Sequence, residues 1–168
     1  MITVLWIVGI SLSVSAMCSI LEAVLLSVTA SYVEFLKETE SKAGIYLRQM
    51  KTAIDEPIAA ILTLNTIAHT AGAAMGGSAA TKVFGEVWIG VFTGVLTLAI
   101  LVISEIVPKT IGAVYWKKLA IPSAHLIHWM VILMKPVLVP INSFSRVLRT
   151  PNEETVSRTD LKILAQIG

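Results

Sequence analysis

Long apolar stretches separated by short polar ones dominate the hydrophobicity pattern of this 168-residue chain. Three of them, residues 3–29, 57–81 and 87–113, reach the roughly 20 residues that a helix needs to cross a bilayer. Between the first two, residues 30–56 mix apolar side chains with charges of both signs, which is typical of short amphipathic helices on a membrane surface. We therefore expect an all-α membrane protein with three transmembrane helices and cytoplasmic amphipathic helices.

A fourth apolar stretch, residues 119–144, contains prolines, histidines and a lysine: Pro122, His125, His128, Lys135, Pro136 and Pro140. Basic residues flank it on both sides, namely Lys117, Lys118, Arg146 and Arg149. Positively charged residues favour the cytoplasmic side of a membrane, so both ends are expected to stay there. We interpret residues 119–147 as a broken helix that lies along the inner interface.

The charges that flank the first span predict its orientation. No basic residue precedes it, and four follow it: Lys37, Lys42, Arg48 and Lys51. The positive-inside rule then places the N-terminus outside and the C-terminus in the cytoplasm. The first span lacks the basic region that begins a cleavable signal peptide, so we expect it to be retained. The protein is thus predicted to be a multi-pass protein of the cell membrane.

Composition agrees with the membrane prediction. Hydrophobic residues make up 55% and charged residues 14% of the chain, against roughly a quarter charged in soluble domains. A net charge of +2 and the lack of a basic cluster argue against nucleic acid as a partner. The single cysteine, Cys18, excludes a disulfide framework. No nucleophile–base pair stands out beyond one histidine among serines, so we do not expect an enzyme.

The second span carries a polar stripe. Asn65, His69, Gly72 and Gly76 follow an i, i+4, i+7, i+11 spacing, which is one face of a helix. Asparagine and histidine are costly in lipid and should face protein or water. The two glycines let another helix or an ion pathway approach the backbone. Packing explains each residue singly, but the four together favour a binding site or an interface.

The third span ends in Ser104-Glu105-Ile106-Val107-Pro108-Lys109-Thr110, which combines an acid, a helix breaker and a base. Pro108 has no amide hydrogen, so the carbonyl of Ser104 should lose its helical partner. With the Glu105 carboxylate it forms a cluster of hard oxygens, which suit magnesium, calcium or sodium. The alternative is a plain helix end, with Glu105 in water and Lys109 among lipid headgroups.

These stretches resemble the membrane domain of the CNNM/CorC family of magnesium transporters. The resemblance is carried by Cys18-Ser19-Ile20-Leu21-Glu22-Ala23, by Asp55-Glu56-Pro57 with Leu64-Asn65-Thr66-Ile67-Ala68-His69, and by the stretch that ends the third span. It divides the chain into a transmembrane domain, residues 1–150, and the start of a truncated cytoplasmic CBS-pair module, residues 151–168. It also implies that residues 119–147 form a juxtamembrane belt helix.

The resemblance implies a homodimer in the lipid bilayer that exports magnesium from the cytoplasm, coupled to sodium entry, through an inward-facing cavity. The CBS-pair module would be a further partner. The metal ligands carried over to this chain are Ser19, Asn65 and Glu105, with His69 at another asparagine position of the family. Further residues expected near the pathway are Glu22, Thr66, Gly72, Gly76, Ser104, Pro108 and Lys109.

Two departures from the family pattern leave the identity of the ion open. Thr66 and His69 stand where the family has asparagines. A histidine nitrogen is a poorer ligand for magnesium than an amide oxygen, and it is available to transition metals or protons. The alternative function is a non-transporting regulatory or scaffold membrane protein. In that case Glu22 would pair with Lys109, and Asn65 would bond to His69, only to hold helices together.

Overall fold

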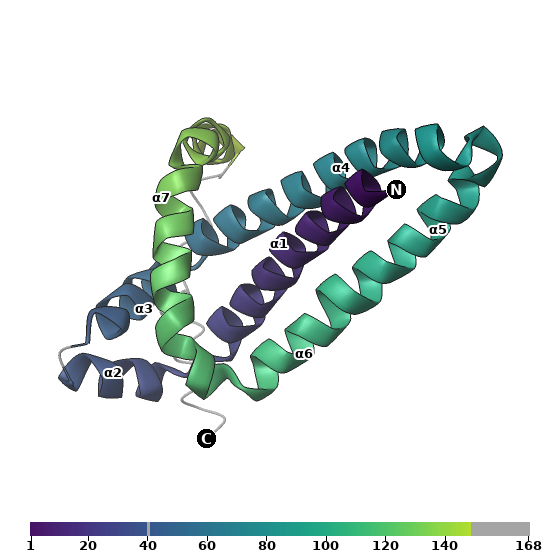
Figure 1. Cartoon of the computed structure of the whole chain (residues 1–168). Coiled ribbons are helices and arrows are strands. Elements are labelled where there is room, and N and C mark those ends of the chain that lie inside the picture. The colour runs from purple at the N-terminus through teal and green to yellow at the C-terminus, as the bar shows by residue number, and fades with distance from the viewer. Residues whose placement is uncertain (40, 149–168) are drawn as a thin grey trace, which may run out of the picture. The chain divides into compact units, whose positions relative to one another are not determined.

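The computed structural model describes residues 1–39 and 41–148, with side-chain surroundings up to Val137. All elements in this part of the chain are helical (Figure 1). They are α1 (Ile2–Ser27), α2 (Ala30–Glu38), α3 (Lys42–Thr52), α4 (Asp55–Phe84), the 3₁₀ turn η1 (Glu86–Trp88), α5 (Ile89–Ala99), the π-helix η2 (Ile100–Ile106), α6 (Val107–Val114) and α7 (Trp116–Leu148). The all-α prediction is thereby confirmed for the described residues.

The chain divides into two compact units, Met1–Met134 and Lys135–Gly168. Every contact described below lies within the first unit. The start of the CBS-pair module, expected at residues 151–168, falls outside the described residues, so that expectation stays a prediction.

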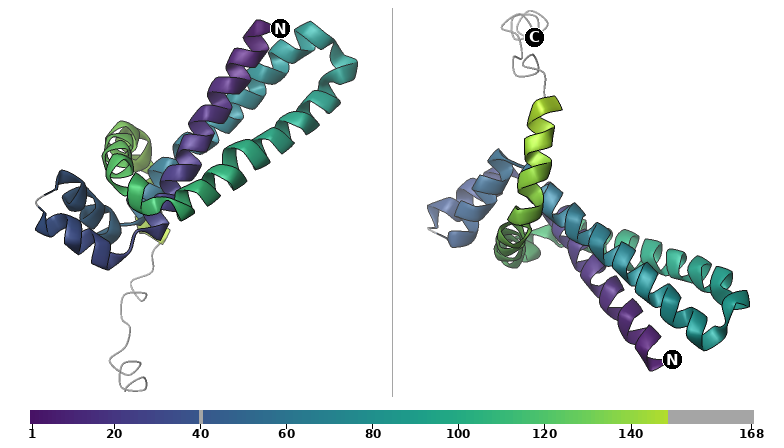
Figure 2. Two further views of the ribbon diagram at one scale, coloured as in Figure 1. Left: turned by 60° about the horizontal axis from the view of Figure 1, so that its bottom comes forward. Right: turned by 90° about the horizontal axis from the view of Figure 1, so that it is seen from above.

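Helix α1 is the central element of the first unit. It packs along α4 on one side and against η2 and α6 on the other, as the views of Figures 1 and 2 show. Contacts between α1 and α4 recur about once a turn: Val8 with Gly76, Ser11 with Gly72 and Ser15 with His69. Residue numbers rise along α1 as they fall along α4, so the two helices are antiparallel.

A cluster of buried apolar residues joins the C-terminal end of α1 to α2, α3 and the start of α7. Its members are Val24, Val28, Val33, Leu36, Ala43, Leu47, Ala120 and Ala124. The hydroxyl of Tyr32 donates a hydrogen bond of 3.2 Å to the carbonyl oxygen of Lys117. The ring of Tyr32 also meets that of Trp116 edge to face, with ring centroids 5.2 Å apart. Helix α2 is therefore attached to α7 by polar as well as apolar contacts.

Two short helices, α2 and α3, lie in the segment for which amphipathic helices are predicted. Their amphipathic role stays a prediction. Gly44 lets them approach, since a Cβ atom at that position would lie 2.7 Å from the carbonyl carbon of Leu36. Partial burial lowers the pKa of Lys51 on α3. The position of these helices at the cytoplasmic membrane surface stays a prediction.

The two ends of α4 differ slightly from the prediction. The helix begins at Asp55, before the predicted start of the span at residue 57, and Ile54 occupies the capping position. It continues to Phe84, beyond the predicted end at residue 81. Gly85 makes the turn with φ of 83°, a left-handed conformation that glycine adopts without steric cost.

Four described helical segments are long and apolar enough to cross a membrane: Ile2–Ser27, Asp55–Phe84, Glu86–Val114 and Trp116–Val137. The first three correspond to the predicted spans, but the fourth means that the count of three is not confirmed. The backbone of α7 is helical from Trp116 to Leu148, and the boundary between the two units lies within it, between Met134 and Lys135. The predicted break in this helix stays a prediction. The belt position of α7 stays a prediction.

Candidate cation-binding site

Helices α1 and α4 are joined by hydrogen bonds in the middle of their interface. The Oγ atom of Ser15, a fully buried residue, lies 2.5 Å from Nε2 of His69. One turn further along, the hydroxyl of Ser11 donates to the carbonyl oxygen of Ala68 at 2.7 Å. Gly72 makes this approach possible, because any Cβ atom there would collide with the side chain of Ser11. Small residues on both helices therefore bring the polar groups together.

The π-helix η2 places Glu105 beside His69. The Oε1 atom of Glu105 lies 4.0 Å from Nδ1 of His69, and the two side chains are 35% and 23% exposed. This separation exceeds the length of a hydrogen bond, which is about 2.7–3.2 Å between heavy atoms. The carboxylate and the imidazole are thus neighbours without a direct hydrogen bond.

The π-helical register is compatible with the proline that follows. The amide of Val107 donates to the carbonyl oxygen of Val102, five residues back. The next position in this register is Pro108, which has no amide hydrogen and lies opposite the carbonyl of Ile103. An α-helical register would instead leave the carbonyl of Ser104 without its donor. The π-helix thus changes which carbonyl faces the proline.

Two buried oxygens near this contact have no hydrogen-bond partner among the described residues: Oγ of Ser19 and Oδ1 of Asn65. Ser19 follows Ser15 by four residues, and Asn65 precedes His69 by four. Because α1 and α4 are antiparallel, moving from Ser15 to Ser19 and moving from His69 to Asn65 lead the same way along the interface. The helix register therefore places Ser19 opposite Asn65. An unsatisfied buried polar atom costs about 1–3 kcal/mol. These oxygens are therefore open to a ligand.

An ion pair joins α1 to α6 close by. The Nζ atom of Lys109 lies 3.1 Å from Oε2 of Glu22. Gly112 brings the two helices together, because a Cβ atom there would lie 2.7 Å from the carbonyl oxygen of Ile20. The charge of Glu22 is balanced within this pair. Glu105 is left as the carboxylate that faces His69.

The donor set fits a cation that accepts oxygen ligands. Within the described part of the chain, no group of three or more His, Cys, Asp or Glu side chains could hold a metal ion by itself. A cation near Glu105 would therefore also need the hydroxyl of Ser19 and the amide oxygen of Asn65. Oxygen ligands of this kind suit hard cations such as magnesium.

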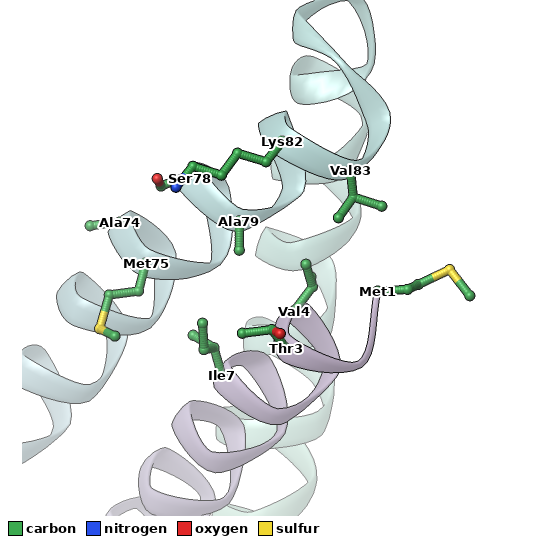
Figure 3. A pocket seen from close by; sticks show the side chains of 10 residues that line it. All are labelled: Met1, Thr3, Val4, Ile7, Ala74, Met75, Ser78, Ala79, Lys82 and Val83. Atoms are coloured by element: carbon green, nitrogen blue, oxygen red, sulfur yellow. The ribbon is translucent and has the colours of Figure 1, made fainter.

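Two grooves run along α1 and α4, and Ser11, Ala68 and Gly72 line the second of them. One, of about 550 Å³, lies at the N-terminal end of α1, where Val4 and Ile7 face the Met75 and Ala79 side of α4 (Figure 3). The other, of about 310 Å³, has an almost wholly apolar lining. None of the four candidate ligands lines either groove. The inward-facing cavity stays a prediction.

Comparison with known proteins identifies the family. Residues 6–168 match the family described as "Cyclin M transmembrane N-terminal domain", or CNNM. The chain belongs to the CNNM family. The resemblance found in its sequence motifs is confirmed. With its apolar helices, membership of this family makes the chain a multi-pass membrane protein.

Individual relatives extend the comparison. A UPF0053 protein of Synechocystis is 33% identical over 158 residues, which cover 92% of this chain and 45% of that protein. The UPF0053 inner membrane protein YfjD of Escherichia coli is 35% identical over 94 residues, covering 56% and 22%. A chloroplastic DUF21 domain-containing protein of Arabidopsis thaliana is 29% identical over 131 residues, covering 78% and 20%. The chain spans less than half the length of these relatives.

Not every residue expected near the pathway of this CNNM domain lies at the site. Thr66 is exposed, and its hydroxyl donates to the carbonyl oxygen of Leu62 at 2.8 Å. Ser104 is fully buried, but its hydroxyl donates to the carbonyl oxygen of Ile100 at 2.8 Å. Gly72 and Gly76 are buried against α1, and Pro108 is buried in α6. These contacts show how the five residues shape the helices, and their place near an ion pathway stays a prediction.

Ser15 is the site residue that the sequence analysis missed. Its hydrogen bond to His69 connects residues 54 positions apart in the chain. A signal was present, because Ser11, Ser15 and Ser19 repeat every four residues and therefore share one face of the first helix. In a span with other serines, that spacing was outweighed by the ordinary use of serine for helix packing.

Ser15, His69 and Glu105 lie in the order serine, histidine, acid that is found in the catalytic triads of hydrolases. A triad needs an acid that hydrogen-bonds the histidine, and 4.0 Å is too long for that. It also needs an accessible nucleophile, whereas Ser15 has no exposed surface in the middle of α1. Amide hydrogens inside a helix are already bonded and cannot form an oxyanion hole. The arrangement favours ion binding over acyl transfer.

Proposed function

We propose that this CNNM domain transports a divalent cation, with magnesium as the first candidate. The observation that carries the proposal is the pair of buried, unpartnered oxygens of Ser19 and Asn65, one turn from the contact between His69 and Glu105. A desolvated cation would satisfy both oxygens and balance the carboxylate. Because magnesium binds several oxygens at about 2.0–2.1 Å, water would have to complete its shell.

The proposed direction is export from the cytoplasm, coupled to sodium entry. Basic residues follow the first span and none precedes it, which supports an outside N-terminus and a cytoplasmic C-terminus. In that orientation Ser19 and Glu105 lie toward the cytoplasmic ends of their helices, where an inward-facing cavity would open. The direction and the coupling ion rest on the family resemblance.

The proposed partners are a second copy of the chain and the CBS-pair module. Large apolar side chains of α4 and α5 are exposed in the single chain: Leu62, Ile67, Met75, Val91, Val95 and Leu98. Such side chains are covered either by lipid or by another transmembrane helix. A homodimer within the bilayer would bury part of this surface.

Transport in proteoliposomes tests the proposal. We expect magnesium flux, followed with an entrapped indicator dye, to depend on an opposing sodium gradient. Glu105→Gln and Asn65→Ala should each reduce the flux at least about tenfold, because each removes a proposed ligand. Glu86→Gln, in the turn between α4 and α5, is the matched control and should leave the flux unchanged. Equal flux in Glu105→Gln and the control would contradict the proposal.

A scaffold or regulatory role is the second candidate, and one observation favours it. The ion pair of Glu22 with Lys109 is what a purely structural use of these residues predicts. The other predicted contact, between Asn65 and His69, is replaced by the bond of His69 to Ser15. A domain without measurable flux, in which Asn65→Ala raises the unfolding temperature by removing an unsatisfied oxygen, would support this role.

A further inference from the structure

The two ring nitrogens of His69 face different groups. Nε2 is hydrogen-bonded to the hydroxyl of Ser15, and Nδ1 faces Oε1 of Glu105 at 4.0 Å. When Nε2 carries the proton and donates it to Ser15, the lone pair of Nδ1 points toward a carboxylate. Two acceptors that face each other repel unless a cation lies between them.

We propose that His69 is a nitrogen ligand through Nδ1, and that it makes the site prefer a first-row transition-metal divalent cation over magnesium. Ser15 is the positioning residue that holds the ring. The inference rests on the proposed function, because the ion would use the same Glu105, Asn65 and Ser19. It differs from the proposed function in the cation, which is a transition metal instead of magnesium.

The separation of the two ligand atoms supports a shared ion. Two ligands at about 2.1 Å from one metal ion lie about 3.0 Å apart at a right angle and about 4.2 Å apart in line. The distance of 4.0 Å between Nδ1 of His69 and Oε1 of Glu105 lies between these two values and closer to the in-line one. It is too long for a hydrogen bond, so the same distance disfavours a directly bonded pair.

The contact of His69 with Ser15 resembles the hydrogen bond that orients a histidine ligand in a metal site. Histidine ligands usually donate their other ring N–H to a fixed acceptor, which sets both the tautomer and the orientation of the ring. Ser15 is fully buried on α1, so its hydroxyl is held by helix packing. When Nε2 donates its proton to that hydroxyl, Nδ1 is unprotonated and faces Glu105.

The chemistry of the donor set decides between classes of cation. Imidazole nitrogen suits iron, nickel, copper or zinc, and manganese less strongly, whereas magnesium prefers oxygen from carboxylates, amides and water. Replacing one oxygen ligand by nitrogen therefore raises affinity for transition metals relative to magnesium. His69→Asn returns an amide oxygen to this position and should reverse the preference.

Manganese is the probe for the test, because its electron spin echo is modulated by a directly bound imidazole nitrogen. The chain has three histidines, and His125 and His128 lie on α7. His128 stacks on Tyr46, and Nδ1 of His125 lies 3.0 Å from the carbonyl oxygen of Ile121. In a His125→Asn/His128→Asn variant, purified with a tag that lacks histidine, a nitrogen signal can come only from His69.

We expect nitrogen modulation in that variant and in the unmodified chain, and its loss in His69→Asn. Calorimetry should show manganese binding at least about tenfold tighter than magnesium, with the ratio reduced about tenfold or more in His69→Asn. The ratio of manganese affinity to magnesium affinity is measured on the unmodified chain. It therefore decides the question even if a variant fails to fold. Binding of both metals at similar affinity, or manganese binding without a nitrogen signal, overturns the inference alone. Absence of any divalent-cation binding overturns the proposed function as well.

Ser15→Ala tests the positioning role. Without its acceptor the ring is free to turn, so manganese affinity should fall about tenfold while magnesium affinity stays the same. Ser13→Ala is the matched control, because the Ser13 hydroxyl is exposed and bonds only to the carbonyl of Gly9. If Ser15→Ala keeps both the nitrogen signal and the manganese affinity, Ser15 does not position the ligand.

Discussion

Nζ of Lys109 and Oε2 of Glu22 form a 3.1 Å ion pair between α6 and α1. The pair lies next to the close approach of Gly112 to α1 and balances a carboxylate that would otherwise be charged within a membrane segment. It separates the roles of the two acids: Glu22 holds helices together, and Glu105 faces His69.

The first prediction concerns this ion pair. Lys109→Met leaves the carboxylate of Glu22 without its partner and should lower the free energy of unfolding by about 1–3 kcal/mol. The double variant with Glu22→Gln removes both charges and should recover part of the loss. Thermal unfolding in detergent, followed by circular dichroism, measures the effect. Lys118→Met, at an exposed position, is the control. Equal losses in the single and double variants would show that the pair is not coupled.

The second prediction concerns Gly112. A methyl group there would lie 2.7 Å from the carbonyl oxygen of Ile20 and 2.9 Å from Cβ of Ala23, so α6 must move away from α1. Gly112→Ala should cost about 1–3 kcal/mol of stability through this overpacking. Gly94→Ala has open space around its Cβ atom and should instead stabilise α5 by about 0.4–1 kcal/mol. The two unfolding midpoints should therefore shift in opposite directions, and a shift of the same sign contradicts the packing described.

The third prediction concerns the contact between α1 and α4. Gly72→Ala collides with the side chain of Ser11 and should destabilise the protein by about 1–3 kcal/mol. Ser11→Gly removes the colliding atoms, since the Cα atom of Ser11 lies 3.9 Å from the added methyl group. The loss in the double variant should thus be smaller than the sum of the two single losses. Gly77→Ala, with no neighbour within 4 Å, is the control. If the stability losses of Gly72→Ala and Ser11→Gly are strictly additive, the added methyl group does not collide with Ser11.

The fourth prediction concerns the number of spans. Single cysteines replace Lys117 and Lys135 in a Cys18→Ala background, and a membrane-impermeant maleimide is applied to vesicles of each orientation. If α7 lies along the inner interface, both cysteines react only from the cytoplasmic side. Thr3→Cys, near the N-terminus, should react only from outside. Labelling of positions 117 and 135 from opposite sides would make α7 a fourth crossing, as its length and apolarity allow.

Much of the fold could be predicted because the local pattern determines it. Proline and acids mark the start of α4, glycine marks its end, and the apolar runs give the lengths of the long helices. The π-helix was not predicted, since it differs from an α-helix by one residue of register. That register depends on how the chain accommodates Pro108 while Gly112 packs against α1.

The candidate site was predicted only in part. Asn65 and His69 share a helical face with the glycines, and that face does contact α1. Thr66, adjacent in sequence to Asn65, lies about 100° around the helix and is exposed, so its place near the pathway stays a prediction. Ser15 was missed because the four-residue spacing of Ser11, Ser15 and Ser19 is also what serines that only pack helices can show.

The sequence by itself determined that the protein is a helical membrane domain of the CNNM family, because hydropathy, helical periodicity and short motifs are local properties. The tertiary structure decided that Glu22 is paired, that His69 lies between Ser15 and Glu105, and that the oxygens of Ser19 and Asn65 are unpartnered. Those relationships join residues of different helices. They depend on the register in which the helices pack, which small residues such as Gly72 and Gly112 permit but do not specify alone.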